Sequence, residues 1–152
     1  MSTFETKNFG VVSCTSDALI QFPSGLPGFE ERRQYVALQF ADSKPLTFLQ
    51  SIEDPDLCFI TLPVLAIEPA YRLQLDAEAS ALLGFPLGHQ PRIGSEVLCL
   101  AIISLEESGP TANLLAPVVV NIANLQAVQA VSADTGYSHQ HPLLTQETAV
   151  CS

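Results

Sequence analysis

Residues 111–121, with the sequence TANLLAPVVVN, constrain the fold more than any other stretch of this chain. Seven of these eleven residues are Ala, Leu or Val, which is typical of a core strand, but Pro117 interrupts them. Proline has no N–H for a strand ladder, so Pro117 predicts an edge, a bulge or a break between two short strands. Asn113 needs solvent or hydrogen-bond partners, because an unsatisfied buried amide costs roughly 1–3 kcal/mol. Two interpretations follow: a bent strand whose Asn113 side chain ties down a neighbouring loop, or an edge that binds a partner.

Short apolar runs with strand periodicity recur on both sides of this stretch. They predict a kinked strand or hairpin over residues 3–14 and strands over 17–22, 35–40, 45–52, 58–62, 96–105 (central to the sheet) and 125–132. Residues 64–67 are expected to continue a strand past Pro63. One helix is predicted over residues 77–83, with Asp76 as N-cap and Gly84 as the stop.

About nine short strands and one helix, without alternation of strands and helices, predict an all-β fold. We expect a small antiparallel β-barrel-like domain with one short helix, because closure is a common way to remove sheet edges. A single domain over residues 1–143 and a flexible C-terminal tail over residues 144–152 are predicted.

Composition indicates an ordered globular domain. Of the 152 residues, 47% are apolar and only 14% are charged, which excludes disorder of the whole chain. The four cysteines, Cys14, Cys58, Cys99 and Cys151, form no C-x-x-C pair and fit buried reduced thiols better than a disulfide framework. No apolar run approaches the ~18 residues that a membrane span needs. The sequence therefore predicts a soluble cytoplasmic protein without membrane contact.

The charge is strongly negative. Six Lys or Arg face sixteen Asp or Glu, for a net charge of −10, and no Lys or Arg follows Arg92. Such a surface repels phosphate groups, which argues against nucleic acid and anionic membrane as direct partners, and attracts basic proteins. The alternative interpretation is that the acidity serves solubility alone.

Glu53, Asp54 and Asp56 surround Pro55 between two apolar runs. Paired carboxylates can act as acid and base, but only in a cleft that separates their pKa values. Asp is also favoured in turns, because its side chain caps the turn backbone. Turn chemistry is the preferred interpretation, with metal binding and a hydrolase as the alternatives.

Residues 22–30, FPSGLPGFE, predict a turn-rich loop, since two prolines and two glycines stand between Phe22, Leu26 and Phe29. Such a loop either carries function or covers one end of a barrel. His139 and His141 alternate in a way that could chelate a metal, but two imidazoles without a third ligand make a weak site. No nucleophile elbow, phosphate loop or dinucleotide fingerprint occurs, so neither an enzyme nor a cofactor is expected.

Four segments together resemble the bacterial flagellar assembly factor FliW family. They are FPSGLPGFE at 22–30, FLQSIEDPDLCF at 48–59, TANLLAPVVVN at 111–121, and YS at 137–138 with HPL at 141–143. They occur in the order and spacing of the family, and the likeness extends over nearly the whole chain to about Leu143.

The resemblance implies a small antiparallel β-barrel-like domain that is not an enzyme and is a monomer alone. Proteins of this family bind CsrA, a basic RNA-binding homodimer that represses translation of flagellin messenger RNA. They also bind flagellin, so that export of flagellin releases the factor to capture CsrA. On this basis an acidic face that binds CsrA is expected to include Glu53, Asp54, Asp56, Glu106 and Glu107. Phe29, Glu30 and Asn113 are further candidate partner-binding residues.

The chain departs from the family pattern in two places. Family members often carry Lys or Arg within the segment that corresponds to residues 122–126, where this chain has IANLQ, and an Arg before the terminal His-Pro, where this chain has Gln140. Contacts made by those basic residues are therefore not carried over. A small-molecule-binding β-barrel is the alternative function, and it requires an interior cavity.

Overall fold

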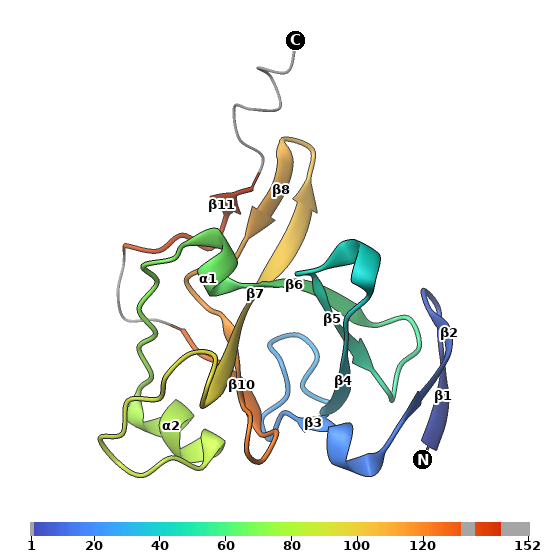
Figure 1. Ribbon diagram of the computed structural model, residues 1–152, viewed down its shortest axis with the longest axis horizontal. Coiled ribbons are helices and arrows are strands. Elements are labelled where there is room, and N and C mark those ends of the chain that lie inside the picture. The colour runs from blue at the N-terminus through green and yellow to red at the C-terminus, as the bar shows by residue number, and fades with distance from the viewer. Residues whose placement is uncertain (1, 132–135, 144–152) are drawn as a thin grey trace.

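A mostly antiparallel sheet of short strands forms the greater part of the molecule (Figure 1). The structure is a computed structural model and describes residues 2–131 and 136–143. One sheet follows the order β10-β9-β7-β6-β5-β4-β3, with β8 paired to β7 and β11 paired to β8, while β1 and β2 form a separate hairpin. The strands are β1 (Ser2–Thr6), β2 (Gly10–Cys14), β3 (Ile20–Gln21), β4 (Gln34–Leu38), β5 (Thr47–Ser51), β6 (Cys58–Pro63), β7 (Val97–Glu106), β8 (Gly109–Ala112), β9 (Val118–Asn121), β10 (Ala127–Gln129) and β11 (His141–Pro142).

The predicted strands are confirmed in place among the described residues, with shorter bounds at several ends. Residue 132, the end of the last predicted strand, lies outside the described residues. Residues 3–14 form the predicted hairpin, and β7 pairs with β6 on one edge and with β8 and β9 on the other. Residues 17–22 are only partly strand, because a 3₁₀ turn at Ser16–Ala18 precedes the two-residue β3. A further 3₁₀ turn occupies Ala41–Ser43. The two-residue β11 was not predicted, since its ladder with β8 is too short to leave a pattern.

The predicted helix is α2 (Ala77–Leu83), and its caps are those expected from the sequence. The Asp76 side chain accepts a hydrogen bond from the N–H of Ala79, and Gly84 adopts the left-handed conformation at φ 85°. The expectation that residues 64–67 continue β6 is wrong, because they form a single helical turn, α1 (Val64–Ile67). Pro63 ends the ladder, and the N–H of Glu68 closes the turn on the carbonyl of Val64 at 2.8 Å.

The sheet is not closed into a barrel, which corrects that part of the predicted fold. Its two end strands, β3 and β10, meet only at an isolated parallel bridge between Gln21 and Gln126. There the N–H of Gln21 donates to the carbonyl of Leu125 at 2.9 Å. A barrel needs a ladder along the full length of the last strand pair, and Pro23, two residues beyond the bridge, has no N–H to extend one.

The break predicted at Pro117 is present between β8 and β9. Ala112 pairs with Ile103 of β7, and Val118 pairs with Leu100 of the same strand. Val118 is therefore six residues along the chain from Ala112, whereas Leu100 is only three residues from Ile103, so the chain bulges between the two strands. The Asn113 side-chain oxygen accepts a hydrogen bond from the N–H of Ala116 at 2.9 Å. The bent-strand interpretation is therefore confirmed in outline, although Asn113 ties down its own bend and not a neighbouring loop.

Two hydrophobic clusters cover opposite sides of β7 and β9. One contains Cys99, Ala101 and Val119 and packs under α2 and the segment around Tyr71. The other contains Leu100, Val118 and Val120 and packs against Phe22, Leu26 and Tyr35. All four residues of β9 are buried, which explains its continuous apolar run. In Figure 1 the loop of residues 22–30, in blue, lies among the strands of the open sheet, and its residues Phe22 and Leu26 are buried in the second cluster.

Candidate functional site

The turn between β5 and β6 is built around a fully buried glutamine. Gln50 is 0% exposed, and its side-chain N–H groups donate to the carbonyls of Ser51 at 3.0 Å and Leu57 at 3.1 Å. The Asp54 side chain accepts a hydrogen bond from the N–H of Asp56 at 3.0 Å. This is the turn chemistry predicted for these carboxylates. Gln50 was not singled out in the sequence, because a polar residue in a strand gives no sign of which carbonyls it reaches.

Glu53 is used in a long-range contact with the start of β4. Its Oε1 accepts hydrogen bonds from the N–H groups of Arg33 at 2.7 Å and Gln34 at 3.0 Å. Asp54 lies 3.7 Å from Arg32, measured from its Oδ2 to the guanidinium Nε. Two of the three predicted carboxylates in this turn, Glu53 and Asp54, are therefore occupied by internal contacts. Glu53 and Asp56 are exposed, and Asp54 is half-buried.

The loop of residues 22–30 is pinned at both ends. Phe22 and Leu26 are buried, while Phe29 is 41% exposed and packs edge-on against Phe59 with ring centroids 5.4 Å apart. The Arg33 guanidinium donates to the carbonyl of Pro23 at 2.8 Å and to that of Glu30 at 3.2 Å, which holds the loop closed. Its predicted role as a structural cover is consistent with this burial.

Gly25 is the residue that lets the loop close on itself. Its φ is +69°, and a Cβ there would lie 2.5 Å from the Cα of Glu30. Glu30 is exposed, and its carboxylate accepts a hydrogen bond from the N–H of Gly28 at 3.1 Å. Backbone hydrogen bonds from Glu30 itself and from Gly28 lower the pKa of the Glu30 carboxyl group, so it carries its charge at neutral pH.

Glu106 and Glu107 lie at the tip of the β7–β8 hairpin. Glu106 pairs with Gly109 across the tip, and both glutamates are exposed. In Figure 1 this hairpin extends away from the rest of the sheet at the top of the molecule. The predicted acidic residues are thus divided between two hairpins, β5–β6 and β7–β8. The neighbouring Leu105 is 75% exposed and adds apolar surface beside the glutamates.

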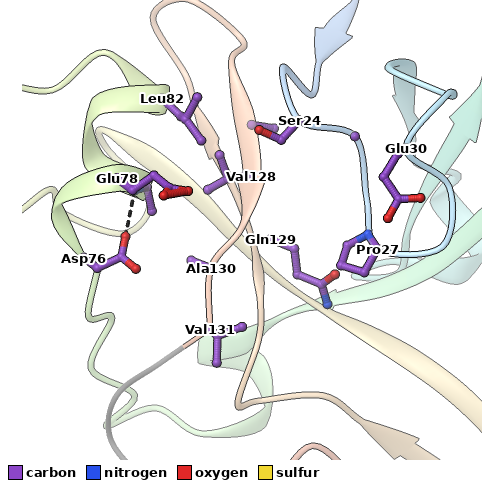
Figure 2. A pocket seen from close by; sticks show the side chains of 13 residues that line it. Ser24, Pro27, Glu30, Asp76, Glu78, Leu82, Val128, Gln129, Ala130 and Val131 are labelled. Carbon is purple, nitrogen blue, oxygen red and sulfur yellow. Dashed lines mark hydrogen bonds between the residues drawn. The ribbon is translucent and has the colours of Figure 1, made fainter.

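A groove of about 280 Å³ lies between the loop of residues 22–30, α2 and the edge strand β10 (Figure 2). Its acidic lining residues are Glu30 from the loop and Asp76 and Glu78 from the start of α2. Figure 2 shows β10 running between α2 on one side and the loop on the other. Sequence reasoning singled out Glu30 and the cap Asp76 separately, but it could not bring the loop and the helix together, because 46 residues separate them.

Two further groups were considered at the sequence level. His141 lies in β11 and His139 in the turn before it, and no group of three or more His, Cys, Asp or Glu within residues 2–131 and 136–143 is placed to hold a metal ion. The helices that the structure describes are all too short or too polar to cross a membrane. The predicted tail of residues 144–152, including Cys151, lies outside the described residues.

Comparison with known proteins identifies relatives over nearly the whole chain. The family described as FliW protein matches residues 3–143. The flagellar assembly factor FliW of Bacillus subtilis (strain 168) is 33% identical over 138 residues, which cover 91% of this chain and 94% of that protein. The flagellar assembly factor FliW of Anoxybacillus flavithermus is 33% identical over 144 residues, with 93% and 94% covered.

A solved structure supports the same assignment. The crystal structure of a flagellar assembly factor FliW superimposes with a TM-score of 0.81 at 29% identity, covering 96% of this chain and 99% of that one. Its agreement extends to the mostly antiparallel sheet and the small helical content described above. On the sequence match, the fold and the four segments that carry the resemblance, this chain belongs to the FliW family of flagellar assembly factors.

Proposed function

We propose that this protein acts without catalysis, by binding the translational regulator CsrA and, in exchange, flagellin. Bound CsrA would release the flagellin messenger RNA, and accumulating flagellin would displace CsrA. The observation that carries the proposal is a net charge of −10 on a member of the FliW family. CsrA is a basic RNA-binding dimer, so the two surfaces have opposite sign.

Charge of this size acts mainly on the rate of encounter. Complementary charge can raise association rate constants to about 10⁸–10⁹ M⁻¹s⁻¹ at low salt, compared with about 10⁵–10⁶ M⁻¹s⁻¹ for uncharged surfaces. At physiological ionic strength the Debye length is about 8 Å, so exposed carboxylates further apart than this act weakly on one another. The association rate with CsrA should therefore fall steeply as salt rises, while the dissociation rate changes little.

The exposed carboxylates are the best candidates for this steering. Asp56, Glu106 and Glu107 are exposed, whereas Glu53 binds two backbone N–H groups and Asp54 lies beside Arg32. Removing Glu53 would damage the turn as well as the charge. We therefore assign the electrostatic contribution to Asp56 and the β7–β8 tip, with Glu53 and Asp54 shaping the surface on which Asp56 stands.

Phe29 and Asn113 are proposed to act differently in partner contact. Phe29 offers a partly exposed aromatic ring that is already held by Phe59, and pre-ordered aromatic rings are frequent anchors at protein interfaces. The oxygen of the Asn113 side chain is occupied by the N–H of Ala116. Asn113 would therefore influence a partner through the shape of the bend.

The test is binding of purified protein to a CsrA dimer and to flagellin, separately and in competition, in the cytoplasmic ionic-strength range. The variant Glu106→Lys/Glu107→Lys changes the net charge by +4, and Glu5→Lys/Asp42→Lys is the matched control, because both control residues are exposed acids on other elements. We expect the hairpin variant to slow association with CsrA at low salt by roughly tenfold more than the control.

Failure to retain either partner at micromolar concentrations would contradict the proposed function. Equal effects of the two charge-reversal variants would leave only a general charge effect and refute the assignment to the hairpin tip. Simultaneous binding of flagellin and CsrA without competition would refute the exchange.

A further inference from the structure

We propose that the groove beside β10 binds an extended peptide segment that carries Lys or Arg, as an added antiparallel or parallel strand on the free edge of β10. The proposal stands on the geometry of the sheet edge and does not depend on which protein supplies the segment. It goes beyond the partner exchange proposed above, because it names a mode of recognition and a place for it.

The backbone of β10 offers hydrogen-bonding groups on its outer edge. On its inner edge the carbonyl of Gln126 accepts from Asn121 at 2.8 Å, and the N–H of Ala130 donates to Pro117 at 2.9 Å. Residues of a strand alternate between its two edges. Gln129 therefore directs its N–H and carbonyl away from β9, and no backbone hydrogen bond to them is found among residues 2–131 and 136–143.

The opposite end of the sheet stops just short of covering this edge. β3 reaches β10 at the bridge between Gln21 and Gln126, and the next group that could donate belongs to Pro23, which has no N–H. The chain then turns away, with the N–H of Gly25 bonded to the carbonyl of Phe22 at 2.9 Å. Among the described residues the edge is therefore unpaired at Gln129, which is half-buried, whereas Ala127 is only 1% exposed.

Residues on both sides of this edge form the walls of the groove. Ala79 and Leu82 of α2 stand on one side, and Ser24 and Pro27 of the loop stand on the other. Figure 2 shows β10 between these walls, with the side chains of Val128 and Leu82 close to each other. An added strand lies about 4.8 Å from its neighbour and presents side chains to both faces in turn. A bound segment would thus place alternate side chains against α2 and against the loop.

The acidic residues that line the groove favour a segment with basic side chains. Glu30 stands on the loop wall and Asp76 and Glu78 on the helix wall, and the residues that line the groove include no Lys or Arg. Sheet edges in natural proteins are commonly protected against pairing by Lys side chains. Here no Lys or Arg occurs after Arg92, so β10 lacks this protection. Basic side chains at successive positions of the segment would reach carboxylates on both walls.

The experiment uses the full chain labelled with ¹⁵N and the synthetic peptide acetyl-Thr-Val-Lys-Arg-Lys-Val-Thr-Thr-amide, whose basic residues at successive positions face both walls. One control peptide replaces each Lys and Arg by Glu. A second keeps the sequence and methylates the backbone nitrogens at successive positions, which preserves the charge but blocks both edges of the added strand. We expect saturable amide shifts centred on Gln129 with the first peptide, slower hydrogen exchange of its N–H, and at least tenfold weaker binding of both controls.

Two variants separate the walls from the edge. Glu78 is exposed on α2, and Glu78→Lys should weaken binding of the basic peptide by roughly three- to tenfold. The matched change Asp42→Lys, at an exposed acid away from the groove, should leave peptide binding within about twofold. Gln129→Pro removes the outward N–H, and its fold is checked by the dispersion of the remaining amide signals. Where that variant does not fold, the methylated peptide supplies the same test without changing the protein.

Equal binding of the methylated peptide would overturn strand addition, because only charge would then be recognised. Equal binding of the Glu peptide would overturn the basic preference. Shifts that spare β10 at saturating peptide would place the contact elsewhere and refute the proposal. Protection of the Gln129 N–H that rises with protein concentration alone would identify a second copy of this chain as the occupant, which also refutes it.

Discussion

Replacing Asn121 by alanine should destabilise the protein through the junction of β9 with α2. Asn121 is 5% exposed, and its side-chain N–H donates to the carbonyl of Leu83 at 2.7 Å. Its side-chain oxygen accepts from the N–H of Ala123 at 2.9 Å. Leu83 is the last residue of the helix and is 0% exposed, so its carbonyl depends on such a donor.

The magnitude follows from the number of bonds lost. A typical hydrogen bond contributes about 1 kcal/mol net, and a buried group left unsatisfied costs about 1–3 kcal/mol. The Leu83 carbonyl keeps a second donor, the side chain of Asn124 at 3.1 Å, and the N–H of Ala123 belongs to an exposed residue. We therefore expect Asn121→Ala to lower the free energy of unfolding by ~2–3 kcal/mol, at the lower end of what two fully orphaned groups would cost.

Urea and thermal unfolding measure this loss. For a domain of this size a change of 1 kcal/mol shifts Tm by about 2–4 °C, so a decrease of roughly 4–12 °C is expected. Asn124→Ala is the matched control, because it removes a donor to the same carbonyl and an acceptor for the N–H of Gln126 from an exposed position, and should cost about 0.5 kcal/mol. The variant Asn121→Asp tests the direction of the change of stability with pH. The introduced carboxyl group can donate to Leu83 only when protonated, so its stability relative to the natural protein should improve as pH falls.

Equal losses for Asn121→Ala and Asn124→Ala, or a loss below about 0.5 kcal/mol for the former, would refute the reasoning from burial. An Asn121→Asp variant whose relative stability is flat between pH 7 and pH 4 would show that the Leu83 carbonyl does not need this donor.

Three further outcomes are expected. Gly25→Ala should lower Tm measurably, because its φ of +69° and the 2.5 Å approach leave no room for a Cβ, and an unchanged Tm would contradict this. The pKa of Glu96 is lowered from 4.5, chiefly by the backbone hydrogen bond from Arg92. Its contribution to stability is therefore present above pH 4.5 and lost below, and Glu96→Gln should be less stable at pH 7 with a difference that vanishes in acid. Burial raises the pKa of Cys99 to about 12 and also raises that of Cys58, so alkylation at pH 8 should modify Cys58 slowly and Cys99 only on unfolding, as mass spectrometry would show.

Local signals predicted most of the elements because they act within a few residues. The cap Asp76 and the stop Gly84 bracket α2 as expected, and Pro117 marks a real break between strands. The helical turn α1 was missed because four apolar residues after a proline fit a strand and a helical turn equally well. Tertiary packing favours the helical turn here, since Val64 is 0% exposed within the core cluster.

The site was harder to predict because it depends on residues far apart in the chain. Glu53 reads as one more surface acid until its contacts with the N–H groups of Arg33 and Gln34 are seen. The groove forms where a loop, a helix and an edge strand come together, and the spacing of apolar residues along the chain does not predict such long-range contacts. The prediction that the sheet closes into a barrel was wrong for a similar reason. The pattern predicted the strands, but β3 and β10 meet at one bridge only, and Pro23 lacks the N–H that would extend it.

The bend at residues 113–117 also determines which side chains point inward. Ala112 and Val118 are both even-numbered, yet they belong to clusters on opposite sides of β7, because the three surplus residues are an odd number. Deleting or inserting one residue in this bend would invert the parity and turn the three consecutive valines of β9 against the wrong neighbours, unless the strand slipped. Length changes of two residues would keep the parity. Among natural or engineered relatives, tolerated gaps at this bend should therefore be even in size.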